Sequence, residues 1–291
     1  MISLRRSLLF LPGNNPGMLQ NGGVFGADGV ILDLEDSVAP NQKDAARFLV
    51  SQALKTVDYE QSETIVRVNP LDTFGKTDIP AIVACRPSAL LLPKVESPDD
   101  ILAAVRLIET AEKTPGEVKI IALLETPKGI AEAYSIAKAH ERIVALALGA
   151  EDYTAALGAK RTKEGNEIFS ARTQVINSAA AAGIQSIDTP FTDAADEAGL
   201  IADTMLAKRL GFKGKLSINP RQIDSIHSVF NPSPQDIIWA DQVIAAIEKA
   251  ESEGAGVASL NGKMVDAPVV SRAQTIRFLA ERLGLKGEDA L

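Results

Sequence analysis

The sequence predicts an α/β fold, a (β/α)8 TIM barrel with a C-terminal helical appendage, and three observations lead to it. Short runs rich in Val, Ile and Leu alternate with longer amphipathic stretches, as expected when helices cover both faces of a parallel sheet. Eight such runs fit within the 291 residues, which suits a closed barrel. The turn at 12–16 lacks the GxGxxG spacing of an open dinucleotide-binding sheet.

Residues 1–230 are assigned to the barrel, because no low-complexity linker or internal repeat divides them. The strands are expected at Ser7–Gly13, Gly29–Asp36, Thr64–Pro70, Ala89–Ser97, Lys119–Thr126, Val144–Asp152, Ser186–Pro190 and Lys215–Pro220. Apolar residues at helical spacing place helices between them, including Gln42–Thr56, Ser97–Ala111, Lys128–Ala139, Asn166–Ala182 and Asp193–Leu210.

Residues 231–291 are expected to form a C-terminal helical and lid segment. Two helices are predicted there, at Asp236–Glu253 and Val269–Leu283, with a glycine-bearing loop at Gly254–Val265 between them. That loop contains Asn261-Gly262, a pair typical of a tight turn. Its mixture of polar and apolar residues indicates a segment that packs against another surface.

Composition excludes several classes of function. A formal net charge of −8 argues against a nucleic-acid surface, which needs a concentrated excess of Lys and Arg. No run approaches the roughly 20 apolar residues that cross a bilayer, and we interpret the N-terminal apolar run as a first strand, not a signal peptide. The single cysteine, Cys85, allows no internal disulfide. The cytoplasm is therefore the expected compartment.

Polar residues gather where the predicted strands end, which in a barrel of this kind is the face that carries the chemistry. Several carboxylates with one arginine and one lysine would repel one another there unless a cation neutralised them. Carboxylates without Cys or His select a hard ion such as Mg²⁺ or Mn²⁺. Glu125 and Asp152, at the ends of neighbouring strands, are the predicted metal ligands.

Arg67 is the predicted partner of an anionic substrate, because a guanidinium can hold a carboxylate with two parallel hydrogen bonds. Its alternative role is a structural salt bridge to Glu35 or Glu125. Glu35 and Asp36 are expected to support Arg67 or metal-bound water, or one of them acts as a base.

Lys94 raises a competing mechanism, since a desolvated lysine can form a Schiff base with a carbonyl substrate. Nearby carboxylates would raise its pKa, which disfavours this mechanism. His140 and His227 lie away from the predicted strand ends, so both are expected to pack or to face solvent, and Cys85 is expected to be inert.

A series of short motifs identifies a resemblance. In chain order they are Arg5-Arg6-Ser7 with Phe10-Leu11-Pro12-Gly13, Asp33-Leu34-Glu35-Asp36, Arg67-Val68-Asn69, Leu92-Pro93-Lys94-Val95-Glu96, Glu125-Thr126, Leu148-Gly149-Ala150-Glu151-Asp152-Tyr153, Ile187-Asp188-Thr189-Pro190, Ile218-Asn219-Pro220-Arg221-Gln222 and Asn261-Gly262-Lys263-Met264-Val265-Asp266. Over essentially its whole length the chain resembles the family of citrate lyase beta subunits (citryl-ACP lyases) and malyl- and citramalyl-CoA lyases. The adjacent Gly22-Gly23 pair, which weakens the end of the first helix, is a small departure from the pattern.

The resemblance implies a barrel of the phosphoenolpyruvate/pyruvate type, Mg²⁺ at Glu125 and Asp152, and substrate binding at Arg67 and Glu125. It also implies a homo-oligomer, a trimer or hexamer, in which Asp266 reaches a neighbouring subunit's site as a catalytic acid. The implied reaction is Mg²⁺-dependent retro-aldol cleavage of (3S)-citryl-ACP, or another citryl thioester, to oxaloacetate and acetyl-ACP. Its partners would be the citrate lyase alpha subunit and the acyl carrier subunit.

Two alternatives stay open at this point. One is a free-standing citramalyl-CoA or malyl-CoA lyase that uses the same metal site with a CoA carrier. The other is a non-catalytic docking subunit for an acyl carrier protein. Arg67, Glu125 and Asp152 are all present, and a mere scaffold would gain nothing from such a costly cluster of buried charges, which argues against the second.

Overall fold

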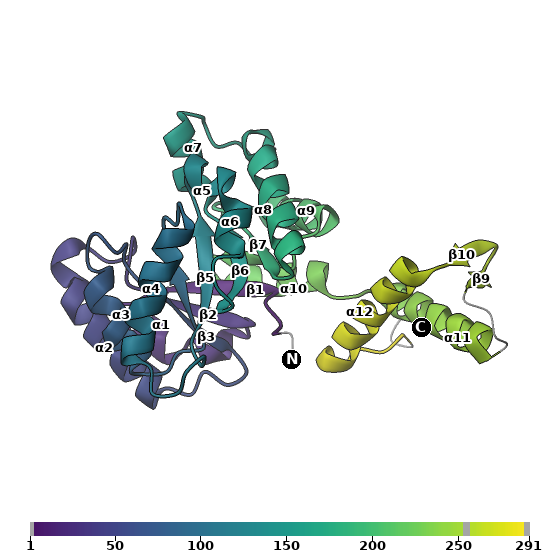
Figure 1. Ribbon diagram of the computed structural model, residues 1–291, viewed down its shortest axis with the longest axis horizontal. Helices are drawn as coiled ribbons and strands as arrows, with labels where there is room; N and C mark the ends of the chain where they lie inside the picture. The colour runs from purple at the N-terminus through teal and green to yellow at the C-terminus, as the bar shows by residue number, and fades with distance from the viewer. Residues whose placement is uncertain (1–2, 253–256, 288–291) are drawn as a thin grey trace. The chain divides into compact units, whose positions relative to one another are not determined.

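The computed structural model describes residues 3–252 and 257–287. The chain divides into two compact units, Met1–Phe230 and Asn231–Leu291. The first unit is the predicted barrel, and the second holds the C-terminal helices (Figure 1).

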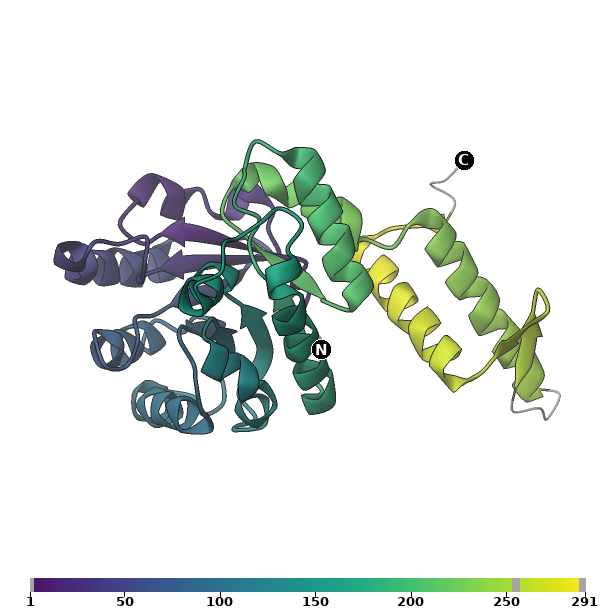
Figure 2. The ribbon, with the colours of Figure 1, turned by 90° about the horizontal axis from the view of Figure 1, so that it is seen from above.

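Eight parallel strands close into a barrel, so the predicted fold class is confirmed. Each strand pairs with the next, and β1 also pairs with β8. Figure 2 shows helices around the strands. The strands are β1 (Ser7–Pro12), β2 (Gly29–Asp33), β3 (Glu63–Arg67), β4 (Ala89–Leu92), β5 (Lys119–Leu124), β6 (Ile143–Leu148), β7 (Gln185–Asp188) and β8 (Gly214–Ser217).

Helices follow most strands and return the chain to the start of the next one. They are α1 (Pro16–Gln20), α2 (Lys43–Thr56), α3 (Gly75–Val83), α4 (Pro98–Ala111), α5 (Pro127–Ala131), α6 (Ala133–Ala137), α7 (Ala150–Leu157), α8 (Phe169–Ala182), α9 (Glu197–Leu210) and α10 (Ile223–Phe230). Short 3-10 turns lie at η1 (Gly23–Phe25), η2 (Pro40–Gln42), η3 (Asn166–Ile168) and η4 (Pro220–Gln222).

Apolar side chains fill both faces of the sheet, because alternate residues of a strand point to opposite sides. In β1, Leu8 belongs to the cluster inside the barrel, whereas Leu9 and Leu11 belong to the cluster between strands and helices. Small residues of β4 and β6, Ala89 and Ala145, help to fit the inner cluster into the narrow interior. The barrel is thus a packed core, and its chemistry is confined to the ends of the strands.

The strands end earlier than the sequence predicts, and several predicted site residues lie in the loops that follow. β2 ends at Asp33 and not at Asp36, because the Asp33 carboxylate accepts the N–H groups of Glu35 and Ser37 and turns the chain. β6 ends at Leu148, and the chain enters α7 within the segment predicted to be strand.

Two predicted helices also need correction. The segment Lys128–Ala139 forms two short helices, α5 and α6, and not one. The helix expected from Asp193 begins at Glu197, because the Asp196 side chain accepts the N–H of Gly199 and caps it.

The C-terminal unit is built from α11 (Pro234–Ser252) and α12 (Ala267–Leu283). Between them the predicted loop forms a hairpin of β9 (Ala258–Leu260) and β10 (Lys263–Val265), and Gly254, where that loop was expected to begin, lies outside the described residues. Asn261 and Gly262 both have positive φ, 51° and 75°, which confirms the predicted tight turn.

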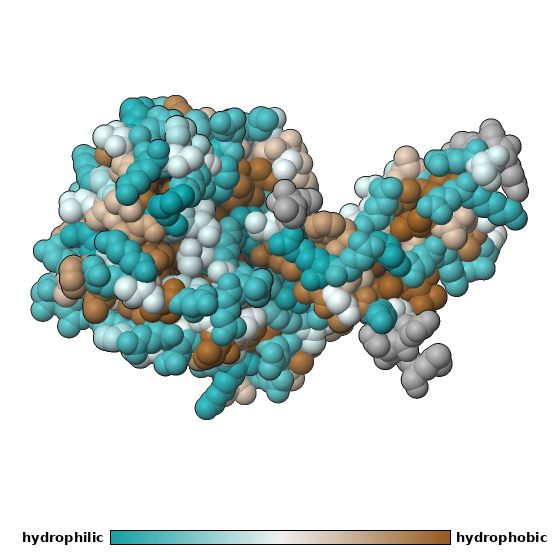
Figure 3. Space-filling model, turned by 90° about the horizontal axis from the view of Figure 1, so that it is seen from below, coloured by the Kyte–Doolittle hydropathy of each residue, from teal (hydrophilic) through white to brown (hydrophobic). Residues whose placement is uncertain are grey.

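Apolar residues join the two helices and the hairpin of this unit, with Ala240, Val243, Val265 and Ala273 buried at the centre. Others are exposed: Met264 is 69% exposed, and apolar patches are visible on this unit in Figure 3. Among the described residues, no helix combines the length and hydrophobicity needed to cross a membrane.

Candidate active site at the mouth of the barrel

Arg67 and Asp33 form the base of the site. They end the neighbouring strands β3 and β2 and are paired in register, so both side chains reach the same level. Arg67 Nε and Nη2 donate to the two oxygens of Asp33 at 2.6 and 2.7 Å. The Phe10 ring packs against the guanidinium, 4.7 Å from its carbon to the ring centroid. Burial alone would raise the pKa of Asp33, but the bonds to Arg67 lower it, and the pair stays charged.

The remaining nitrogen of Arg67 faces the predicted acids of the next loop. Its Nη1 lies 2.9 Å from Glu35 Oε2 and 3.6 Å from Asp36 Oδ2. The structural salt bridge to Glu35 offered as an alternative is therefore present, with Asp33 as an additional partner. Because Asp33 already occupies the two-bond face of the guanidinium, only Nη1 is positioned to meet a substrate carboxylate.

A buried lysine fixes the loop that carries Glu35. Lys43, in the first turn of α2, donates its Nζ to the carbonyl oxygens of Leu34 and Glu35 at 2.8 and 2.7 Å. Burial lowers the pKa of Lys43, with the carboxylates of Asp33 and Glu35 acting in the opposite direction. These bonds hold the Glu35 backbone and with it the carboxylate.

Lys94 lies between two carboxylates of the site, those of Glu35 and Asp152. Its Nζ lies 3.2 Å from Glu35 Oε1 and 3.8 Å from Asp152 Oδ2. Its backbone has φ +51°, a left-handed conformation that is rare for lysine and that places its N–H 2.8 Å from Glu125 Oε1. Burial lowers the pKa of Lys94, but the carboxylates outweigh it and the net shift is upward. This confirms the predicted shift and argues against a neutral amine nucleophile.

Glu125 follows β5 directly and is 4% exposed. Burial, followed by the charges of Glu35 and Asp152, raises the pKa of Glu125 to about 8. Gly149 makes room for this side chain, because a Cβ at position 149 would lie 2.6 Å from Glu125 Oε2.

Asp152 lies in the first turn of α7, after the end of β6 at Leu148. It is therefore not the strand-end residue that the sequence predicted. Its charge contributes to the raised pKa of Glu125, so the structure brings the two predicted ligands together. Within 3–252 and 257–287, no group of three or more His, Cys, Asp or Glu side chains forms a metal cluster. A buried and a half-exposed carboxylate, with positions left for water and substrate, nevertheless suit Mg²⁺.

A cavity of about 560 Å³ adjoins these residues. Its wall includes Lys94 and residues of the loops after β3, β4 and β5, among them Asn69, Thr73, Glu96 and Thr126. Lys94 is the residue through which this cavity borders the mouth.

Asp266 belongs to the C-terminal unit, where it caps α12 by accepting the N–H of Val269 at 3.3 Å. Its role in a neighbouring subunit's site stays a prediction. The histidines pack as expected: His227 Nε2 contacts Ser7 Oγ at 2.7 Å, at the opposite end of β1, and His140 Nδ1 accepts the N–H of Arg142.

Sequence reasoning missed Lys43 and the glycine requirement at position 149, and it gave Asp33 no role. Asp33 carried a usable signal, because it precedes Glu35 by two residues, and alternate residues of a strand face the same side. Nothing in the sequence around Lys43 distinguishes it from a surface lysine of a helix.

Comparison with known proteins adds three findings. The family model "HpcH/HpaI aldolase/citrate lyase" matches residues 6–220. Citrate lyase subunit beta of Leuconostoc mesenteroides is 46% identical over 282 residues, 95% of this chain and 93% of that protein. Mitochondrial citramalyl-CoA lyase of Homo sapiens is 32% identical over 290 residues, 95% of this chain and 85% of that protein.

A solved structure supports the same relationship. The protein CitE from Mycobacterium tuberculosis, in complex with magnesium, acetoacetate and coenzyme A, is 31% identical to this chain, with a TM-score of 0.79. The similarity covers 97% of this chain and 100% of that one.

Proposed function

Since this chain belongs to the HpcH/HpaI aldolase/citrate lyase family, we propose that it acts as a citrate lyase beta subunit. It is a metal-dependent carbon–carbon lyase, and the reaction is cleavage of (3S)-citryl-ACP, or another citryl thioester, to oxaloacetate and acetyl-ACP. The observation that carries the proposal is the pair of neighbouring carboxylates, Glu125 and Asp152, at a mouth where Arg67 and Lys94 do not prevent the pKa of Glu125 from rising to about 8. Greater identity to a citrate lyase subunit beta than to a citramalyl-CoA lyase supports the substrate.

Glu125 and Asp152 would hold Mg²⁺, or Mn²⁺ as the second choice. A bound divalent ion supplies positive charge that favours ionisation of the substrate hydroxyl. The residues fit it because burial and the nearby charges of Glu35 and Asp152 raise the pKa of Glu125 to about 8, and a divalent ion would favour its ionised form in place of a proton. The relative CitE holds magnesium in its solved structure.

Arg67 and Lys94 would hold the carboxylates of the substrate, through Nη1 and Nζ. Glu35 lies between these two cations, 2.9 Å from Nη1 and 3.2 Å from Nζ. Burial raises the pKa of Glu35, although Arg67 opposes the shift. A carboxylate with a raised pKa suits a general base, so Glu35 is our choice to accept the hydroxyl proton.

As that proton leaves, the carbon–carbon bond breaks and its electron pair becomes the enolate of the acetyl thioester. The enolate carbon then needs a proton, and we assign its donor as Asp266 of a neighbouring subunit. This assignment requires a homo-oligomer, for which we propose a trimer or hexamer on the basis of the family resemblance. The separate C-terminal unit and its exposed Met264 support an extended contact of this kind.

The acyl carrier subunit and the citrate lyase alpha subunit are the proposed partners, and the cytoplasm is the proposed compartment. A free-standing citramalyl-CoA lyase remains the second candidate, favoured by relatives that match 95% of the chain. Because the mouth keeps uncompensated charges, a docking role without catalysis is disfavoured.

The test is cleavage of citryl-ACP, citryl-CoA and citramalyl-CoA by the purified chain, with and without excess EDTA, followed by keto-acid release. We expect the citryl thioesters to be cleaved fastest, EDTA to abolish release and Mg²⁺ to restore it. A preference for citramalyl-CoA would favour the second candidate. Release that persists in EDTA would refute the metal role and return Lys94 to consideration.

A further inference from the structure

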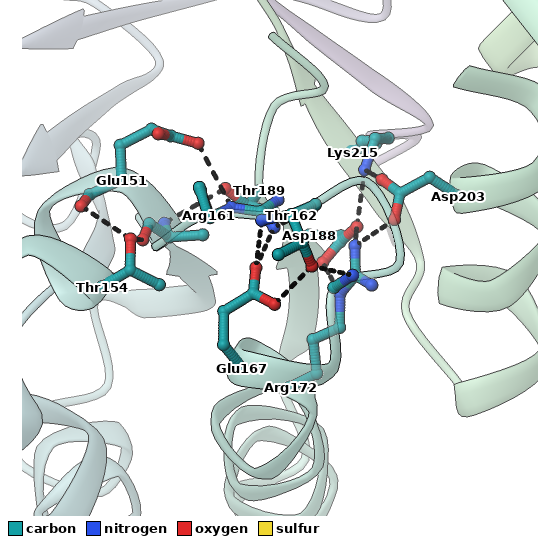
Figure 4. Close-up of polar contacts among 12 residues, drawn as sticks. Glu151, Thr154, Arg161, Thr162, Glu167, Arg172, Asp188, Thr189, Asp203 and Lys215 are labelled. Carbon is teal, nitrogen blue, oxygen red and sulfur yellow. Dashed lines mark hydrogen bonds and ion pairs between the residues drawn. The ribbon is translucent and has the colours of Figure 1, made fainter. Parts of the chain in front are cut away.

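We propose that Thr189 is a positioning residue for the metal-binding carboxylate of Asp152, and that a buried cluster of four charges holds Thr189 in place. The cluster comprises Arg172, Asp188, Asp203 and Lys215 (Figure 4). The inference rests on the proposed function, in which Asp152 binds the divalent ion.

The first step is a buried hydrogen bond at the start of α7. Thr189 Oγ1 accepts the N–H of Ala150, the first residue of this helix, at 3.1 Å, and both residues are 0% exposed. First-turn N–H groups have no partner within their own helix, so an acceptor from outside fixes where the helix begins. Asp152 lies only two residues further along, in the same turn.

A second bond fixes the same turn from the other side. The N–H of Gly149 donates to the carbonyl of Leu124 at 3.0 Å, immediately before Glu125. The β6–α7 turn is thus tied to β5, which brings one proposed ligand, and to the end of β7, which brings Thr189. Thr189 therefore sets the position of Asp152 relative to Glu125.

The cluster gives Thr189 a rigid support. Asp188, the residue before it, accepts from Arg172 Nε and Nη2, both at 2.9 Å, and from Lys215 Nζ at 2.6 Å. Asp203 contacts the same two cations. The two acids and two bases, which come from α8, β7, α9 and β8, balance one another. Removing any one of them would leave the buried cluster with a net charge. The end of β7, and Thr189 with it, therefore cannot shift without disrupting these buried ion pairs.

Other contacts of the α7 start are weaker. Arg161 bridges Glu151, beside Asp152, and Glu167 of η3, at 3.2 and 2.6 Å (Figure 4). The Glu151 side chain is 52% exposed, and exposed ion pairs contribute little. The buried Thr189 hydroxyl is the stronger constraint on this helix end.

The test uses Thr189→Val in the full chain, which keeps the side-chain shape but removes the acceptor. Binding of Mn²⁺, measured by electron paramagnetic resonance without substrate, should weaken roughly tenfold, as when second-layer support of a metal ligand is lost. Thr189→Ser keeps the hydroxyl and should bind within about twofold of the parent. Thr204→Val is the matched control, since this buried hydroxyl donates only to the carbonyl of Leu200.

Asp152→Asn, measured in parallel, separates this inference from the proposed function. If Asp152→Asn loses Mn²⁺ while folded Thr189→Val binds like the parent, the positioning role is refuted and the metal site stands. If Asp152→Asn keeps its affinity, the proposed ligand set itself fails. Should Thr189→Val not fold, Thr189→Ala and Thr189→Ser decide, because equal affinity in these two would show that the hydroxyl does not position Asp152.

Discussion

Two groups of charges in the same barrel differ in how they are balanced. The buried cluster has two acids and two bases, and its contacts are 2.5 to 2.9 Å long. The mouth gathers five carboxylates around two cations, and its longer contacts reach 3.8 Å. The mouth members are Asp33, Glu35, Asp36, Glu125 and Asp152 with Arg67 and Lys94.

The pKa shifts follow this difference. Burial raises the pKa of Asp203, but Lys215 and Arg172 outweigh it, and the net shift is downward. For Glu125 burial acts with two neighbouring acids, and the pKa rises to about 8. A cluster that neutralises itself is structural, whereas one that leaves negative charge uncompensated is prepared to receive a cation.

The largest expected effect comes from breaking the balanced cluster. Arg172→Met should lower the free energy of unfolding by about 3 to 5 kcal/mol, because it leaves Asp188 and Asp203 with one cation between them. Urea titration of the parent and the variant measures this. Arg86→Met is the control, since Arg86 pairs with Glu117 at the surface and little change is expected. An equal loss of unfolding free energy in Arg172→Met and Arg86→Met would contradict the structural role of the buried cluster.

A substitution among the carboxylates of the mouth should reduce activity instead of stability. Glu125→Gln should lower kcat roughly 10²- to 10³-fold, because it weakens binding of the ion that stabilises developing negative charge. Stability without metal should stay level or increase, because folding at neutral pH no longer requires Glu125, with its raised pKa, to take up a proton. Steady-state kinetics and urea titration report the two quantities. Glu112→Gln, in the balanced pair with Arg142, should do the reverse and lower stability with little change in kcat. If Glu125→Gln and Glu112→Gln changed kcat and stability in the same way, the distinction between catalytic and structural charges would fail.

The pH dependence sharpens the comparison further. Below about pH 8 a proton competes with the metal for Glu125, so the Mg²⁺ dissociation constant should rise up to about tenfold per pH unit. Without metal, the raised pKa stabilises the fold below the unfolded value of 4.5, and this contribution is lost as pH rises to about 8. Calorimetry between pH 6 and 9 measures the affinity, and a flat profile would contradict the raised pKa.

The barrel was predictable from the sequence because burial on both faces leaves continuous apolar runs. The strand ends were not, since burial continues past the hydrogen-bonded ladder: Leu34, Val68 and Val95 are buried but lie outside the strands. The spacing of apolar residues in the sequence indicates which residues are buried, but not which residues pair in the sheet. Predicted strands therefore extended too far, and Asp152 was assigned to a strand end.

The candidate site was predictable in its residue types but not in its contacts. Glu125, Arg67, Glu35 and Lys94 meet at the mouth because parallel strands share one carboxyl edge. The pairing of Arg67 with Asp33 depends on the register of two strands 34 residues apart in the chain. The positive φ of Lys94 is also invisible in the sequence, where glycine would be the usual marker.

The smallest expected effect comes from Lys43, which supports the mouth through backbone carbonyls of the Glu35 loop. Lys43 has carbonyl oxygens as its hydrogen-bond acceptors, so Lys43→Met should cost about 1 to 3 kcal/mol of unfolding free energy, the range for hydrogen bonds that involve a charged group or leave a buried acceptor unsatisfied. Turnover should fall roughly tenfold, because the freed loop lets Glu35 leave the position between Arg67 and Lys94. Lys119→Met removes a similar bond to the carbonyl of Gly116, far from the mouth, and should spare turnover. If both variants kept full turnover, the Glu35 loop would be held by Asp33 and Arg67 alone.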